Sequence, residues 1–245
     1  MSWFGHAPEA LARVLGVPRV VAERRVASTM DLAHALGAEG APAGTLVIAE
    51  EQTAGRGRGG RHWTSRPRAG IWLTAIERPR GSAGLDVLSL RVGLHLAPVL
   101  ERWTVGPVRL KWPNDLFVGH RKLAGVLIES RWRGPHPDWV AIGLGINLSP
   151  PAEAVEAIGL QDADPEQVLA ECVPAIRAAA FATGPLRDDE LAAFARRDLA
   201  VGHRVREPAP GTVRGISAEG ALLLETPTGV VPHRTGSLVF SATLT

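Results

Sequence analysis

The chain has 245 residues, of which 45% are hydrophobic and 21% are charged, values typical of a folded globular protein. Its 27 basic and 25 acidic residues nearly balance, so overall charge does not indicate a nucleic-acid-binding protein. No run approaches the roughly 20 apolar residues of a membrane span, and Glu9 and Arg13 interrupt the position of a signal peptide. A single cysteine, Cys172, excludes an internal disulfide. We therefore expect a cytoplasmic protein without membrane association, and Cys172 as an inert core residue.

Hydrophobic periodicity and turn residues divide the chain into short elements. Ser28 or Thr29 is expected to cap a helix, and Asp164-Pro165-Glu166-Gln167 is a strong helix start. Gly, Arg and Pro dominate 52–70, which predicts a loop. In chain order, helices are expected at 7–16, from Ser28–Thr29 to Gly37, and at 85–103, 165–182 and 187–199. Strands are expected at 45–50, 70–77, 107–112, 123–132 and 138–147, with a hairpin turn at Gly119-His120 and a connector at 149–163.

The pattern changes at Val201, where short apolar runs alternate with Gly and Pro. About 45 residues suffice for a small β unit leaning on a larger partner. The sequence therefore predicts an α+β protein, with a large domain over 1–199 and a small β domain over 200–245.

Lysine and asparagine are unusually rare and are clustered. Of the 27 basic residues, only Lys111 and Lys122 are lysines, and Asn114 and Asn147 are the only asparagines. A composition bias toward arginine accounts for most of the chain. Such a bias acts most freely where any cation will serve, and ammonium and guanidinium groups are not interchangeable. The remaining lysines are therefore candidates for a functional site.

The glycine- and arginine-rich segment 55–61 (G-R-G-R-G-G-R) can bind an anion. Glycines let backbone N–H groups approach a phosphate closely, and three arginines add charge-assisted hydrogen bonds. A flexible solvated loop or a nucleic-acid-binding stretch are the alternatives. We expect the segment to be mobile until a ligand orders it. No Gly-Lys-Ser/Thr follows, so it is not a Walker A loop.

Three further segments carry candidate chemistry, each with a simpler alternative. Residues 109–115 (R-L-K-W-P-N-D) place Lys, Asn and Asp at a strand end, where they can neutralise a phosphate and hold a divalent cation, although Pro-Asn-Asp is also an ordinary turn. Residues 119–129 place Lys122 at the start of a strand, where a lysine can also snorkel. Residues 143–147 (G-L-G-I-N) are a weak signal.

Taken in order, these segments resemble the biotin protein ligases. The likeness rests on S-T-M-D-L-A, E-E-Q-T-A-G-R-G-R-G-G-R-H-W, L-K-W-P-N-D-L, R-K-L-A-G-V-L-I-E and I-G-L-G-I-N, and covers 28–147 strongly and 201–240 moderately. It implies a mixed-sheet catalytic domain of the biotin/lipoate ligase type followed by a small SH3-like β-barrel.

The resemblance also implies roles for individual residues. Lys111, Arg56, Arg58 and Asp115 would be catalytic. Biotin would be bound by Ser28, Thr29, Met30, Gln52, Arg56, Gly57, Arg58, Lys122 and Gly125. ATP would be bound by Arg58, Arg61, Trp63, Lys111, Asn114, Asp115 and Asn147, with Asp115 as the metal-binding residue.

The implied reaction uses ATP and Mg²⁺ to convert biotin to biotinyl-5'-AMP and transfers biotin to a lysine of a biotin carboxyl carrier protein. No tightly bound cofactor is implied, and a homodimer is left open. Met30 stands where many relatives have asparagine, so one polar contact to biotin differs. Only 27 residues precede Ser28, too few for the winged helix-turn-helix of some relatives, so no DNA binding is expected.

Two other functions compete with this interpretation. Lipoate ligases and octanoyl transferases share the fold but lack K-W-P-N-D. A non-catalytic RNA- or DNA-binding module would interleave arginine with stacking aromatics over a broad surface, whereas Trp63 is the only aromatic close to the arginine run.

Overall fold

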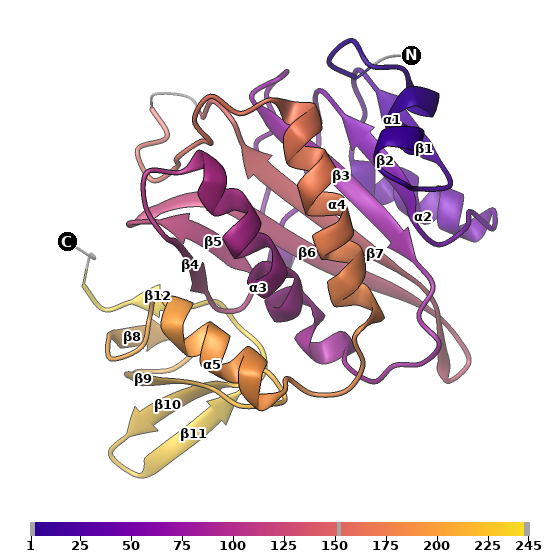
Figure 1. The fold of residues 1–245 in the computed structure, drawn as a ribbon. Coiled ribbons are helices and arrows are strands. Elements are labelled where there is room, and N and C mark those ends of the chain that lie inside the picture. Colours follow the sequence, from indigo (N-terminus) through magenta and orange to yellow (C-terminus); the bar gives the residue numbers. More distant parts are fainter. Residues whose placement is uncertain (1–2, 151–152, 243–245) are drawn as a thin grey trace.

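Two β-sheets organise the protein, which is represented by a computed structural model that describes residues 3–150 and 153–242 (Figure 1). The larger sheet has the strand order β1-β2-β3-β7-β6-β5-β4. β1 and β2 run parallel, and the other neighbours are antiparallel. Its strands are β1 (Val20–Glu23), β2 (Thr45–Ala49), β3 (Gly70–Glu77), β4 (Val108–Lys111), β5 (Asp115–Val118), β6 (Arg121–Arg133) and β7 (His136–Asn147).

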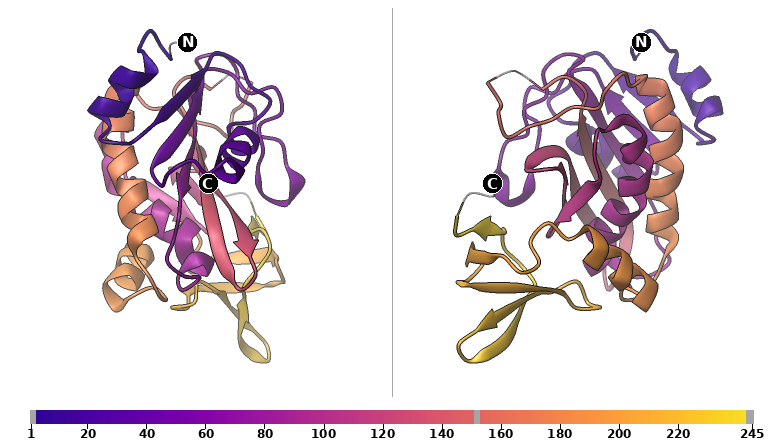
Figure 2. Two further views of the ribbon diagram at one scale, coloured as in Figure 1. Left: turned by 90° about the vertical axis from the view of Figure 1, so that its right-hand side faces the viewer. Right: turned by 60° about the vertical axis from the view of Figure 1, so that its left-hand side comes forward.

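Helices cover both faces of this sheet (Figure 2). α3 (Leu88–Leu100) and α4 (Pro165–Phe181) pack together on one face, and α2 (Thr29–Ala38) lies on the other. Leu88, Val92 and Leu96 of α3 recur at helical spacing and are buried in the main core. α1 (Pro8–Val14) packs near β1, and α5 (Asp188–Arg197) lies near β4. Among the described residues, no helix is both long and apolar enough to cross a membrane.

The predicted helix boundaries rest on capping side chains that the structure contains. The Ser28 hydroxyl accepts a hydrogen bond from the Met30 N–H at 3.2 Å, and Asp164 Oδ1 accepts one from the Gln167 N–H at 3.0 Å. The predicted helix 85–103 is α3 with a short 3₁₀ turn at each end. Cys172 is fully buried and burial raises the pKa of its thiol, which confirms its place in the core.

Strand β1 was not predicted, because its four residues are too short to display a period. Strand β5 was not predicted either, although the turn expected at Gly119-His120 directly follows it, and Gly119 has the positive φ of a tight turn. The remaining strands of the large sheet lie where the sequence predicts them. Residues 151–152 of the predicted connector lie outside the described part of the chain.

The C-terminal residues form a second, antiparallel sheet in the order β11-β10-β9-β8-β12. Its strands are β8 (Arg204–Glu207), β9 (Gly211–Ile216), β10 (Leu222–Thr226), β11 (Gly229–His233) and β12 (Val239–Phe240). The predicted small β region is therefore present, and its closure into an SH3-like barrel stays a prediction.

Hydrogen bonds join the C-terminal sheet to the segments that carry candidate chemistry. The indole Nε1–H of Trp112, a buried residue next to Lys111, donates to the Gly220 carbonyl oxygen at 3.0 Å. Arg61 of the glycine–arginine loop donates to the Ser237 hydroxyl at 3.2 Å. The second sheet therefore contacts the edge of the large sheet where the candidate site lies.

We expect the Trp112→Phe substitution to lower the free energy of unfolding by about 1 kcal/mol, because the Gly220 carbonyl would be left without its partner. Urea unfolding monitored by circular dichroism measures the change. Trp132→Phe is the matched control, because the exposed Trp132 indole bonds, within the described part of the chain, only to Ser130, two residues away. Equal unfolding midpoints for the two variants would contradict this prediction.

Candidate active site

One row of residues crosses the large sheet, and its middle members, Gly145, Gly125 and Asp115, form the floor of the candidate site. The strand register pairs Trp72 with Gly145, Gly145 with Gly125, and Gly125 with Asp115. Asp115 is in turn paired with Lys111 on the edge strand β4. Because directly opposed residues project from the same face of a sheet, the row places two small residues between a tryptophan and a charged pair. The glycines leave a trough in the sheet surface.

The Trp63 ring from the glycine–arginine loop lies in this trough. A Cβ atom added at Gly145 would come within 2.6 Å of the ring, and one added at Gly125 within 2.9 Å. The ring centroids of Trp63 and Trp72 are 6.3 Å apart in an edge-to-face arrangement. The floor therefore requires glycine at both positions, which explains the A-G and G-L-G patterns.

Hydroxyl and amide groups form the polar end of the site. The Thr74 hydroxyl donates to the Thr29 hydroxyl at 2.9 Å. Gln52 Oε1 accepts from the Thr29 N–H and hydroxyl at 2.8 and 3.0 Å, and Gln52 Nε2 donates to Ser65 at 2.8 Å. Met30 is buried beside them, and its methyl group would lie 2.8 Å from a Cβ at Gly143. This end can bind a compact group that carries both hydrogen-bond donors and acceptors.

Charged groups form the other end. Lys122 Nζ lies 2.7 Å from Asp115 Oδ1 and 4.8 Å from the Trp63 ring centroid. Arg58 is half-buried; burial lowers its pKa, and the neighbouring Arg61 acts in the same direction. Among the described residues, no carboxylate lies within ion-pair distance of Arg58. Lys122 is therefore paired, whereas Arg58 stays available to an anionic ligand.

Two of the site residues predicted from the sequence, Lys111 and Asn147, do not line the cavity that the other predicted site residues surround. Lys111 Nζ lies 5.5 Å from the ring centroids of both Phe117 and Phe240. Burial lowers the pKa of Lys111, an effect to which Lys122 contributes and which Asp115 opposes. Asn147 donates from Nδ2 to the Lys122 carbonyl oxygen at 3.1 Å. Lys111 thus lies at the site's margin, while Asn147 supports the strand that carries Lys122.

A cavity brings residues from the predicted segments together. Those named from the sequence that line it are Ser28, Thr29, Met30, Gln52, Arg56, Gly57, Arg58, Arg61, Trp63, Asn114, Asp115, Lys122 and Gly125. Its lining also contains residues that were not named as site residues: His62, Leu73, Thr74, Val126, Leu127, Gly143, Leu144 and Gly145. Thr74 had a signal in the sequence, because it is the one polar side chain within the apolar run G-I-W-L-T-A-I.

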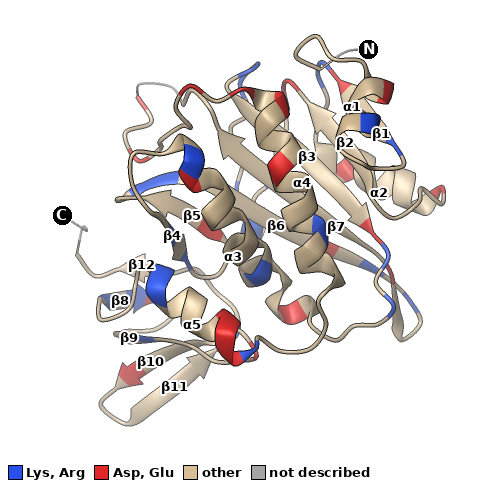
Figure 3. Ribbon diagram, viewed as in Figure 1, with Lys and Arg blue, Asp and Glu red and all other residues tan. Residues whose placement is uncertain are grey.

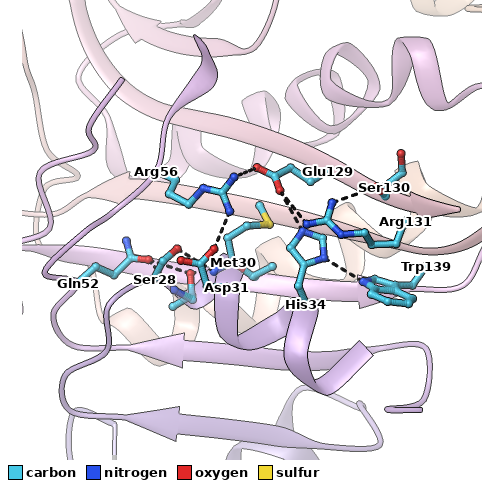
Figure 4. A network of polar contacts seen from close by, with 12 residues as sticks. Ser28, Met30, Asp31, His34, Gln52, Arg56, Glu129, Ser130, Arg131 and Trp139 are labelled. Carbon is cyan, nitrogen blue, oxygen red and sulfur yellow. Dashed lines mark hydrogen bonds and ion pairs between the residues drawn. The ribbon is translucent and has the colours of Figure 1, made fainter. Parts of the chain in front are cut away.

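A polar network borders the cavity where the loop meets α2 and β6 (Figure 4). Arg56 forms ion pairs with Asp31 and Glu129, each at 2.6 Å. His34 Nε2 lies 3.0 Å from the second oxygen of Glu129, and the Trp139 indole Nε1–H donates to His34 Nδ1 at 3.0 Å.

The His34 contacts predict a loss of stability in acid. Burial lowers the pKa of His34 below its usual value of 6.5, and Arg131 adds to the effect. Because the folded state disfavours the protonated imidazole, its contribution is complete above pH 6.5 and is lost as the pH falls through the folded-state pKa. We expect His34→Gln to reduce the difference in unfolding free energy between about pH 7.5 and pH 5.5. Urea unfolding at both pH values measures this difference, and an unchanged difference would contradict the assignment.

Comparison with known proteins agrees with this geometry. A sequence model described as the "Biotin/lipoate A/B protein ligase family" matches residues 22–147, which contain the whole cavity lining. The chain belongs to this family.

Relatives within the biotin/lipoate protein ligase family align over most of the chain. The "Biotin--[acetyl-CoA-carboxylase] ligase" of Paracoccus denitrificans is 35% identical over 219 residues, 80% of this chain and 90% of that protein. The "Bifunctional ligase/repressor BirA" of Escherichia coli (strain K12) is 35% identical over 203 residues, which cover 74% of this chain but 62% of that protein.

Solved structures of the family share the fold. The biotin protein ligase from Aquifex aeolicus in complex with biotin and ATP superposes with a TM-score of 0.77 at 28% identity, covering 91% of this chain and 99% of that one. The biotin protein ligase from Leishmania major in complex with biotinyl-5-AMP gives a TM-score of 0.60 at 28% identity, covering 91% and 99%. The predicted fold class, a mixed-sheet catalytic region with a small C-terminal β region, is confirmed.

Proposed function

We propose that this protein is a biotin protein ligase, which activates biotin with ATP to biotinyl-5'-AMP and transfers it to a lysine of a carrier protein. The observation that carries the proposal is the cavity itself. Its hydroxyl-rich end suits the ureido ring of biotin, and its opposite end presents Arg58 and Lys122 where a carboxylate and a phosphate would meet. The matches to the Paracoccus and Aquifex proteins support the same substrates.

The first step joins two anions, and the residues present suit that task. A biotin carboxylate oxygen attacks the α-phosphorus of ATP in line, forming a new P–O bond as the bond to the pyrophosphate oxygen breaks. Both reactants are negatively charged, so Arg58, Lys122 and Lys111 would offset the repulsion and stabilise the developing charge. The lowered pKa of Lys111 reflects burial that an arriving phosphate would compensate. The chain's own contribution is therefore positioning and charge.

The second step forms the amide. The neutral amine of the acceptor lysine attacks the acyl carbon of the mixed anhydride, the C–O bond to phosphate breaks, and AMP leaves with the electron pair. The amine proton must be lost, and Asp115 is the carboxylate of the cavity lining that could receive it. Asp115 is paired with Lys122, so that role requires the pair to open.

Magnesium fits the site only as an ion carried by ATP. Among the described residues, no group of three or more His, Cys, Asp or Glu side chains could hold a metal ion. Asp115 is the single carboxylate that lines the described cavity. Mg²⁺ is commonly held by one or two carboxylates together with substrate phosphates, so Asp115 would hold the ion, which would offset phosphate charge when bound.

The wider assignments follow from this function. The acceptor would be a biotin carboxyl carrier protein, as the names of the relatives imply, and the enzyme would act in the cytoplasm. We also propose that residues 1–199 form the catalytic domain and 200–245 a C-terminal domain that contacts it through Trp112 and Arg61. The proposal covers ligase activity alone, because the chain aligns with 62% of the E. coli ligase/repressor.

In the view of Figure 3, basic and acidic residues are interspersed.

Biotin-dependent exchange of pyrophosphate into ATP tests the function. We expect exchange with biotin and Mg²⁺, and much weaker exchange with lipoate or octanoate. Exchange that requires lipoate, with none on biotin, would overturn the substrate assignment in favour of a lipoate ligase of the same family.

A further inference from the structure

Arg56 is held by carboxylates from two separate elements. Its Nη1 lies 2.6 Å from Asp31 Oδ1 in the first turn of α2, and its Nη2 lies 2.6 Å from Glu129 Oε1 on β6 (Figure 4). The three residues are far apart in sequence, with separations of 25 and 73 residues. One guanidinium therefore joins the glycine–arginine loop to two parts of the folded body.

Glu129 is itself oriented by His34, which in turn is held by Trp139. An indole N–H can only donate, so the Trp139 bond makes His34 Nδ1 an acceptor. A neutral His34 then carries its proton on Nε2 and donates it to Glu129 Oε2 at 3.0 Å. The side chains of His34 and Glu129 are only 10% and 19% exposed. Glu129 Oε2 is therefore held by His34, with Arg131 Nη2 at 3.9 Å, and Oε1 is directed at Arg56.

The loop has no other ion pair near its tip. Within 54–63, all of which the structure describes, Arg56 is the residue that forms salt bridges. The rest of the tip is held by backbone bonds, such as Gly57 N–H to Arg61 O and Trp63 N–H to Gly55 O, and by Arg61 to Ser237. Gly59 and Gly60 have positive φ and open surroundings. Arg56 thus makes the ionic attachment of this tip to α2 and β6, in addition to the packing of the Trp63 ring over Gly125 of β6.

The charges around Arg56 also limit what it can bind. Two carboxylates face the Arg56 guanidinium, and Arg131 Nη2 lies 3.9 Å from Glu129 Oε2, so the charges around Arg56 balance. Both Nη groups of Arg56 already bind carboxylates, so an arriving phosphate or carboxylate would have to displace one of them. Arg58, two residues further on, has no carboxylate partner among the residues that the structure describes, and it lines the same cavity. The two loop arginines are therefore suited to different tasks.

We propose that Asp31, Glu129 and His34 are positioning residues that hold Arg56 as a clamp, keeping the glycine–arginine loop closed over the acyl-adenylate until the acceptor amine arrives. This inference rests on the proposed ligase function. It gives Arg56 a closing role in place of the direct ligand contact that the family resemblance implies. The mixed anhydride reacts with water to give biotin and AMP, so an open loop would waste ATP.

Hydrogen exchange of the ligand-free protein tests the clamp independently of catalysis. Glu129→Gln keeps the shape of the side chain and removes its charge, and we expect amides in 55–63 to exchange about five- to tenfold faster, with other segments unchanged. Asp31→Asn removes the second arm at a side chain that is 56% exposed, where the fold tolerates the change. Glu153→Gln is the matched control, because it removes an exposed ion pair to Arg66 of the same loop, outside the cavity lining. Wild-type exchange of 55–63 in both clamp variants would overturn the proposal.

The product ratio tests the consequence for the reaction. With biotin, ATP and a biotin carboxyl carrier domain, we expect Glu129→Gln and Asp31→Asn to form about five- to tenfold more AMP per biotinylated carrier than the wild type, because intermediate escapes before transfer. A merely destabilised enzyme would lower both products together and leave the ratio unchanged. An unchanged ratio in both variants would overturn the closing role. If the wild type does not catalyse biotin-dependent ATP–pyrophosphate exchange, the ligase function is wrong. Amide hydrogen exchange in 55–63 would still test whether Asp31 and Glu129 hold the loop.

Discussion

Replacing Lys111 with arginine should lower the rate of biotin-dependent ATP–pyrophosphate exchange by about 10²–10³-fold and leave biotin binding intact. The Lys111 ammonium is confined between the Phe117 and Phe240 rings, with Nζ 5.5 Å from each centroid. A planar guanidinium is larger and directs its donors in a fixed fork, so it cannot deliver the same point charge. Exchange rates and calorimetric titration with biotin measure the two effects separately.

The control for Lys111→Arg is Arg109→Lys, the opposite substitution on the same strand. Arg109 donates to the backbone oxygens of Arg197 and Asp198 and does not line the cavity. We expect its exchange rate to stay close to that of the wild type. Wild-type exchange in Lys111→Arg would remove Lys111 from the activation step.

Replacing Lys122 with methionine should weaken biotin binding about 10²-fold. The change removes the ammonium 2.7 Å from Asp115 Oδ1 and leaves a carboxylate that is only 17% exposed without its counter-charge. That uncompensated negative charge would then repel the carboxylate of biotin. Calorimetric titration with biotin measures the change, and urea unfolding shows whether the variant is folded.

A double-mutant cycle separates the loss of the contact between Lys122 and biotin from the effect of leaving Asp115 without its counter-charge. Lys122→Met combined with Asp115→Asn removes both charges, so we expect part of the lost biotin affinity to return. The part that does not return measures what Lys122 itself gives to biotin. Unchanged affinity in Lys122→Met alone would show that the pair has no part in binding.

Much of the site's chemistry could be predicted from the sequence because it depends on residue type and order. The lysine census singled out Lys111 and Lys122, and a composition bias leaves such a signal only where ammonium cannot be exchanged for guanidinium. Glycine and arginine marked the loop over 52–70, and helix caps at Ser28 and Asp164 set where α2 and α4 begin. These features are local, so neighbouring residues suffice to predict them.

The arrangement of these residues was decided by strand register and by contacts between distant segments. The row from Trp72 through Gly145, Gly125 and Asp115 to Lys111 crosses five strands, and a shift of one residue in any pairing would turn its members to the opposite face. Strand β1 and the role of Thr74 depend in the same way on what packs beside them.

The two rare lysines illustrate both sides of this division. Their identity marked them in the sequence, but only the tertiary structure gave them different settings, with Lys122 paired to Asp115 in the cavity and Lys111 between aromatic rings at its margin. Phe240, which supplies one of those rings, comes from the C-terminal sheet. Glu129 reaches Arg56 across 73 residues of sequence. Composition and spacing determine which chemistry this chain carries, whereas long-range packing determines which groups meet, because such contacts leave no local periodicity in the sequence.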